Sequence, residues 1–78
     1  MSPRLVATTR ELIVALEKDG FSWTRQSGSH AIYRQGDRRV VVAIHSAGDT
    51  IPIGTLKRII RDAGWDEQDL HRLGLVQP

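Results

Sequence analysis

The chain has 78 residues, a net charge of +2 and no cysteine. This length predicts one domain, residues 1–78, whose thin core leaves little room for an enclosed substrate cavity, so that chemistry should take place on an open face. The missing cysteines exclude a disulfide scaffold, a thiolate zinc site and a cysteine nucleophile, and they favour a cytoplasmic protein. We expect no membrane segment, because the apolar runs are short and the first ten residues lack the apolar core of a signal peptide.

Positive charge is concentrated in the middle of the chain. Residues 22–61 contain seven cations and two anions, a net charge of +5, whereas the remaining residues contain four cations and seven anions, a net charge of −3. Nine of the eleven cations are arginine, whose planar guanidinium group suits phosphate. The pattern favours nucleic acid or another polyanion as partner over a basic surface that contacts only water.

The first predicted element is a helix over residues 9–19. Thr8 and Glu11 have the spacing of a capping box, and the apolar residues that follow repeat with helical spacing. Gly20 stands where such a helix is expected to end.

Three strands should follow, over residues 21–26, 30–34 and 38–44. The turns between them, residues 27–29 and 35–37, each contain a glycine and are short enough for hairpins. The sequence therefore predicts an antiparallel meander.

The direction of His30 depends on which strand residues face the helices. Val40 and Val42 share one face of the third strand, and we expect Ile32 on that face too. Strict alternation then places His30 on the helix-facing side. A bulge near Ser29, or the position of His30 at the mouth of its strand, would turn it the other way.

A second helix should begin at Pro52 and end before Gly64. Its apolar face has the spacing i, i+3, i+4, i+7 and consists of Leu56, Ile59, Ile60 and Ala63. Its opposite face carries three cations, Lys57, Arg58 and Arg61. These cations either contact phosphate or form the solvated face that any amphipathic helix has.

A last short helix, capped by Asp66 with Asp69, should run through Leu73. The resulting order is α-β-β-β-α plus a short C-terminal helix. Two helices packed on one face of a three-stranded antiparallel sheet make an α+β fold with the layout of double-stranded-RNA-binding domains.

His30 is the main candidate for a catalytic residue. Imidazole can take up and return a proton near neutral pH, and RNA carries its own nucleophile, the 2′-hydroxyl. Gly28 permits unusual backbone geometry and Ser29 adds a hydroxyl. Arg25 and Arg34 would lie close enough in a hairpin to hold a phosphate. The alternative is an ordinary polar residue at the start of a strand.

The other candidates carry less weight. His45 is a candidate second acid or base, or else a loop residue bonded to the backbone, and His71 is expected on the surface. Trp23 and Tyr33 are expected to pack in the core and on the sheet, with stacking of Tyr33 on an RNA base as the alternative. No metal site or cofactor is predicted, because the histidines lack ligand spacing and accompanying carboxylates.

Several blocks of the sequence occur in a familiar order. Residues 10–21 begin with REL and end with GF, residues 25–34 read RQSGSHAIYR, residues 42–45 read VAIH, and residues 54–64 read GTLKRIIRDAG. Over nearly the whole chain these blocks resemble the HicA toxins, the small mRNA interferases of toxin–antitoxin pairs. They match that family's Q-x-G-S-H signature and its G-T-L helix, while Ala43 stands where the family usually has proline.

The resemblance implies a double-stranded-RNA-binding-like fold and cleavage of mRNA through His30, without metal or cofactor. It also implies a HicB-type antitoxin, wider and more acidic than this chain, that covers the active surface. In this interpretation the residues that hold the RNA are Gly28, Ser29, Arg25, Arg34, Lys57, Arg58 and Arg61. Two alternatives remain: a non-catalytic RNA-binding module, and a protein-interaction domain whose basic face meets an acidic partner.

Overall fold

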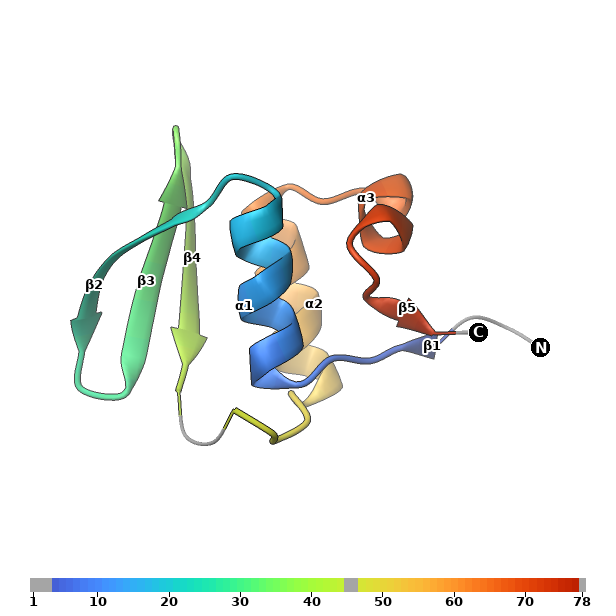
Figure 1. Ribbon diagram of the computed structural model, residues 1–78, viewed down its shortest axis with the longest axis horizontal. Helices are drawn as coiled ribbons and strands as arrows, with labels where there is room; N and C mark the ends of the chain where they lie inside the picture. Colours follow the sequence, from blue (N-terminus) through green and yellow to red (C-terminus); the bar gives the residue numbers. More distant parts are fainter. Residues whose placement is uncertain (1–3, 45–46, 78) are drawn as a thin grey trace.

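The computed structural model describes residues 4–44 and 47–77. In chain order the elements are β1 (Arg4–Leu5), α1 (Thr9–Lys18), β2 (Ser22–Ser27), β3 (His30–Gln35), β4 (Arg38–Ala43), α2 (Ile53–Ala63), α3 (Glu67–Arg72) and β5 (Val76–Gln77). The three long strands form an antiparallel sheet in the order β2-β3-β4, and α1 and α2 both lie on one face of it (Figure 1). The predicted α+β fold of the double-stranded-RNA-binding type is confirmed.

The capping residues predicted from the sequence lie at the ends of the helices. The Thr8 hydroxyl accepts a hydrogen bond from the backbone N–H of Glu11 at 3.2 Å, and the Glu11 carboxylate accepts one from the Thr8 N–H at 2.8 Å. Asp66 and Asp69 form the same reciprocal cap on α3. Pro52 is the N-cap residue of α2 rather than part of its first turn, and no side chain caps this helix.

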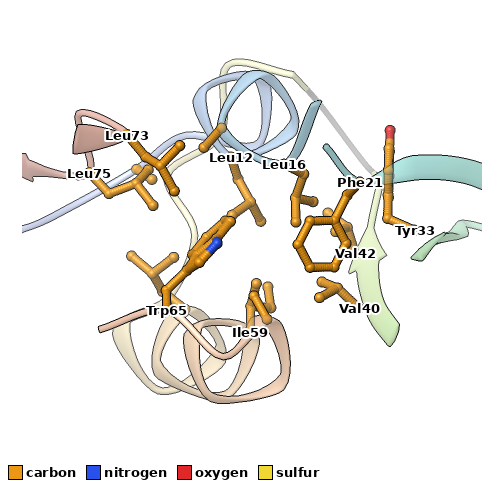
Figure 2. Packing of buried hydrophobic residues seen from close by; sticks show 14 of the residues in the cluster. Leu12, Leu16, Phe21, Tyr33, Val40, Val42, Ile59, Trp65, Leu73 and Leu75 are labelled. Carbon is orange, nitrogen blue, oxygen red and sulfur yellow. The ribbon is translucent and has the colours of Figure 1, made fainter. Parts of the chain in front are cut away.

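The core fills the space between the sheet and the two helices (Figure 2). It is built from Leu12 and Leu16 of α1, Val40 and Val42 of β4, and Ile59 of α2, each at most 1% exposed. Full burial of one such side chain stabilises the fold by about 1.5–3 kcal/mol. These contacts fix the strands, and hence His30, relative to the helices.

The core continues towards α3 through two aromatic rings. Phe21 and Trp65 meet edge to face, with ring centroids 6.3 Å apart. The Trp65 indole N–H donates to the Asp19 carboxylate at 2.7 Å, which joins the end of α1 to the segment before α3. Arg38 lies over the Phe21 ring, 5.7 Å from its centroid, and donates to the backbone oxygen of Ala63.

The two ends of the described chain pair with each other, which the sequence did not predict. β1 and β5 form a second, two-stranded antiparallel sheet, in which Leu5 is opposite Val76 (Figure 1). Strands of two residues are too short to show alternation, so pattern analysis has nothing to detect.

The predicted face of Ile32 is wrong. Ala31 and Tyr33, not Ile32, join Val40 and Val42 in the core, and their registers agree: Ala31 is opposite Val42 and Tyr33 is opposite Val40. His30 therefore lies on the face of the sheet that the helices do not cover, together with Ile32 and Arg34. We call this surface the outer face. Strict alternation along β3 holds, and the bulge in the sheet lies in β2, between Trp23 and Arg25, not near Ser29.

The predicted packing of the strand aromatics is half right. Tyr33 is buried, with 6% exposure, and burial raises the pKa of its hydroxyl, with a further contribution from the charge of Glu17. Trp23 is 56% exposed. It belongs to β2, the edge strand whose residues are all exposed, so the helix layer does not cover its side chain.

Candidate active site

His30 is the first residue of β3 and follows a two-residue turn, Gly28-Ser29. Gly28 has φ +58°, in the left-handed region that other residues enter only with strain, while no atom lies near the place of a Cβ. Backbone conformation, not lack of space, thus explains this glycine. The Gln26 side chain donates to the Gly28 oxygen at 3.1 Å and adds a second restraint to the turn.

The imidazole of His30 is exposed on the outer face, where a large substrate can reach it. Its neighbours across the sheet are Ser27 on β2 and Ala43 on β4. The N–H of Ile44 donates to the oxygen of Ser29 at 2.6 Å, so the turn before His30 is bonded to the chain leaving β4. The histidine therefore stands on a rigid central strand that is held from both sides.

Three arginines share the outer face with His30. Arg25 is opposite Ile32, so it lies diagonal to both His30 and Arg34, at about 7–8 Å between Cα atoms. Arg34 is opposite Arg39. His30 and Arg34 are four steps apart along the strand, a distance of about 13 Å. In the described part of the chain, none of these arginines has an ion pair or a side-chain hydrogen bond.

The outer face therefore carries a line of unpaired positive charge that begins beside the histidine. Arg25 is near enough to share a phosphate with His30, while Arg34 and Arg39 lie further along the strands. The prediction that Arg25 and Arg34 are neighbours agrees with the register. Two apolar residues, Ile32 and its register partner Val41, lie among these arginines, and Ile32 is 5% exposed.

The cations of α2 occupy a different surface. Leu56, Ile59 and Ala63 face the core, and Lys57, Arg58 and Arg61 are all exposed on the opposite side of the helix. Because α2 covers the inner side of the sheet, these three side chains point away from the layer that carries His30. The structure does not bring them together with Arg25 and Arg34.

Other cations serve the fold. Arg72 pairs with Asp19 at 2.8 Å and with Asp69 at 2.7 Å. Burial alone raises the pKa of the Asp19 carboxyl, but hydrogen bonds from Trp65 and Arg72 outweigh it and hold this pKa below its ordinary value. The hydrogen bond from Arg72 likewise lowers the pKa of Asp69. Together with Arg38, these groups tie elements together and are engaged within the protein.

Neither of the other two histidines is placed beside His30 by the described residues. His45, the candidate second acid or base, lies outside the described residues. His71 is an exposed residue of α3, as expected. Across residues 4–44 and 47–77, no group of three or more histidines, aspartates or glutamates could hold a metal ion. None of the helices in those ranges is long and apolar enough to cross a membrane.

Sequence reasoning missed one feature of this region, a hollow of about 520 Å³. It lies where α1 and α2 begin and β4 ends. These three ends are at the lower side of the ribbon in Figure 1. Residues from these three elements and from the loop before α2 line it: Thr9, Val42, Ala43, Asp49, Thr50, Ile51, Pro52, Thr55 and Ile59. A chain of this length was expected to have little room for such a space. The lining comes from distant parts of the sequence and has no local pattern.

A family model matches most of the chain. The family model for the HicA toxin of bacterial toxin–antitoxin systems matches residues 9–65, which run from the start of α1 through the sheet and α2 to Trp65. The chain belongs to the HicA toxin family. No match was found among curated proteins.

Membership of the HicA family identifies the chain as the toxin side of a toxin–antitoxin pair. The matched segment includes the whole outer face and the Gly28-Ser29 turn, whereas β1, α3 and β5 lie outside it. The resemblance inferred from the sequence blocks is thereby confirmed. An antitoxin partner follows from the kind of system to which the family belongs.

Proposed function

We propose that this HicA toxin is an endoribonuclease that cleaves mRNA with His30 as its single catalytic histidine. The observation that carries the proposal is the position of His30, exposed on an uncovered sheet face with the unpaired Arg25 diagonal to it. An open, basic face suits a long, flexible polyanion better than a small enclosed substrate.

The reaction uses a nucleophile that the RNA supplies. His30 removes the proton from a 2′-hydroxyl, the oxygen attacks the adjacent phosphorus, and the bond to the 5′-oxygen of the next nucleotide breaks. The products are a 2′,3′-cyclic phosphate and a free 5′-hydroxyl. General base assistance of this kind contributes about 10²–10⁴-fold to the rate. The route needs no metal, because the leaving group requires only a proton.

The turn and the arginines hold the phosphate during this step. Ser29 and the backbone of Gly28 position the phosphate beside His30, and Arg25 balances the charge that develops on its oxygens. Arg34 holds the RNA backbone further along β3. The proton for the leaving oxygen comes either from His45 or from His30 after it has become protonated.

The antitoxin acts by covering the same surface. A HicB-type protein with an acidic face would neutralise the arginines of the outer face and exclude RNA from His30. Lys57, Arg58 and Arg61 on α2 would contact RNA backbone away from the cleavage point.

The test compares three versions of the full chain expressed in cells: wild type, His30→Ala, and His71→Ala. The last variant removes another exposed histidine, in α3, and is the matched control. We expect wild type and His71→Ala to stop growth and to degrade total mRNA on a gel. His30→Ala should do neither, while its thermal unfolding matches that of the wild type.

Equal mRNA loss with wild type and His30→Ala would contradict the catalytic role of this histidine. If His30→Ala bound RNA normally and was as toxic as wild type without any cleavage, the protein would be a non-catalytic RNA-binding module.

A further inference from the structure

We propose that the hollow at the start of α1 and α2 is a subsite for one nucleobase of the RNA, selective for a base with an exocyclic amino group. The inference deepens the proposed function and rests on it, because it assigns the substrate feature that is read next to His30. We call this hollow, with the nine lining residues given above, the base subsite.

The base subsite adjoins the proposed catalytic centre. Ala43, one of its lining residues, is the register partner of His30, so their Cα atoms are about 4.5–5.5 Å apart. The Ile44 N–H bonds the Ser29 oxygen, which fixes the end of β4 to the turn before His30. The hollow and His30 therefore lie at the same end of the sheet, on neighbouring strands, which is the placement that the proposal requires.

The walls suit a flat, mostly apolar ring. Val42 and Ile59 come from the buried core and are each 1% exposed, and Ile51 is 9% exposed. Pro52 and Ala43 add further apolar surface. A volume of about 520 Å³ falls within the range of small-ligand pockets, about 300–1,000 Å³, which are mostly apolar with a few polar groups that orient the ligand.

The polar groups are unpaired. Thr9 is 5% exposed, and in the described part of the chain its hydroxyl makes no hydrogen bond, although it lines the hollow. Asp49 also lines the hollow but is exposed, and its carboxylate makes no hydrogen bond in the described part of the chain. The backbone of this loop is nevertheless fixed, because the Asp49 oxygen accepts from the Thr9 N–H at 3.0 Å. Both side chains can therefore hydrogen-bond to a ligand without first breaking a bond within the described part of the protein.

The carboxylate decides which bases fit. A carboxylate only accepts hydrogen bonds, so it favours the amino group of cytosine, adenine or guanine. Uracil offers the carboxylate only its N3–H, which is flanked on both sides by carbonyl oxygens that repel the carboxylate. The threonine hydroxyls both donate and accept, so they do not discriminate. Asp49 is thus the residue that gives the subsite its preference.

The test uses free nucleosides and does not depend on cleavage. The methyl NMR signals of Val42, Ile51 and Ile59 in the full-length protein are followed while cytidine, adenosine, guanosine or uridine is added. We expect shifts at these methyls with at least one of the three amino-bearing nucleosides, and at least tenfold weaker binding of uridine. Asp49→Asn should remove the difference, and Thr55→Leu, which fills the hollow, should abolish binding of all four.

The matched control is Asp37→Asn, which neutralises an exposed carboxylate in the turn at the other end of β4 and should change nothing. Absence of shifts with every nucleoside, or a preference that persists in Asp49→Asn, would overturn the base subsite even if RNA is cleaved through His30. Conversely, nucleoside binding at these methyls in a protein that cleaves no RNA would leave the subsite standing and refute the proposed nuclease.

Discussion

At the scale of single residues, two glycines show how backbone and packing constraints differ. Gly20 and Gly28 have φ of +91° and +58°, so alanine at either position is strained by about 1–2 kcal/mol. Only Gly20 is also crowded: a Cβ there would lie 2.5 Å from Nε2 of Gln35, which donates a hydrogen bond to the Asp19 oxygen.

We therefore expect Gly20→Ala to destabilise the protein by about 2–4 kcal/mol and Gly28→Ala by about 1–2 kcal/mol, measured by urea unfolding. Adding Gln35→Ala should rescue part of the loss in Gly20→Ala, because it removes the crowding atom. Equal losses for the two glycines, or no rescue, would show that Gln35 does not constrain Gly20.

His30 itself shows what sequence could and could not settle at this scale. Its position after a glycine turn and its arginine neighbours follow from local spacing. Its direction does not, because Ile32 is more apolar than Ala31, and the pattern assigned the larger residue to the core. The small Ala31 packs inward instead, on the same face as Tyr33, and both join Val40 and Val42 in the core.

At the scale of elements, Asp19 joins the end of α1 to α3 through Trp65 and Arg72. The folded-state pKa of Asp19 lies below its ordinary value of 3.8, so the ionised carboxylate stabilises the fold above that pH. This contribution is lost as the pH falls from about 4 through the folded-state pKa.

Asp19→Asn should lower the stability at pH 7 by about 1 kcal/mol, a decrease in Tm of about 4–8 °C. The difference from wild type should shrink as the pH falls from 7 towards about 2, because protonation makes the wild-type side chain neutral, like asparagine. Thermal unfolding of both proteins between pH 7 and about 2 measures this difference in stability. A difference that stays constant over the whole range would mean that the charge of Asp19 contributes nothing.

The helices and the meander were predictable because caps, glycine stops and hairpin turns are local. Strand ends agreed within one residue for β2, β3 and β4. The β1–β5 pair was not predictable, since its two-residue strands are specified only by their meeting in the folded protein. Trp23 was expected to pack in the core or on the sheet because aromatic side chains usually do, yet it is 56% exposed on an edge strand.

At the scale of the whole molecule, the two basic surfaces face different ways, and RNA can contact both only if it is long enough to pass around the sheet. We expect Arg25→Ala with Arg34→Ala to weaken binding of both short and long RNA. Neutralising Lys57, Arg58 and Arg61 should weaken binding of long RNA only, with a salt dependence reduced by about 0.7 in log–log slope for each lost phosphate contact.

Titrations of short and long RNA at several salt concentrations make this comparison, with Arg10→Ala, an exposed arginine on α1, as the control. If the α2 variant bound short RNA as weakly as the outer-face variant, the two surfaces would act as one. If it bound long RNA normally, α2 would have no part in RNA binding.

The central claim is that His30 activates the 2′-hydroxyl of RNA, and one measurement addresses it most directly. Purified protein is incubated with an RNA that it cleaves at a mapped position. A second sample contains the same RNA with a single 2′-deoxy nucleotide on the 5′ side of that position. The products of both reactions are identified by mass. We predict a 2′,3′-cyclic phosphate from the first RNA and no cleavage at that position in the second. Cleavage of the deoxy-substituted RNA at the same place, or a product with a free 3′-hydroxyl, would contradict the claim.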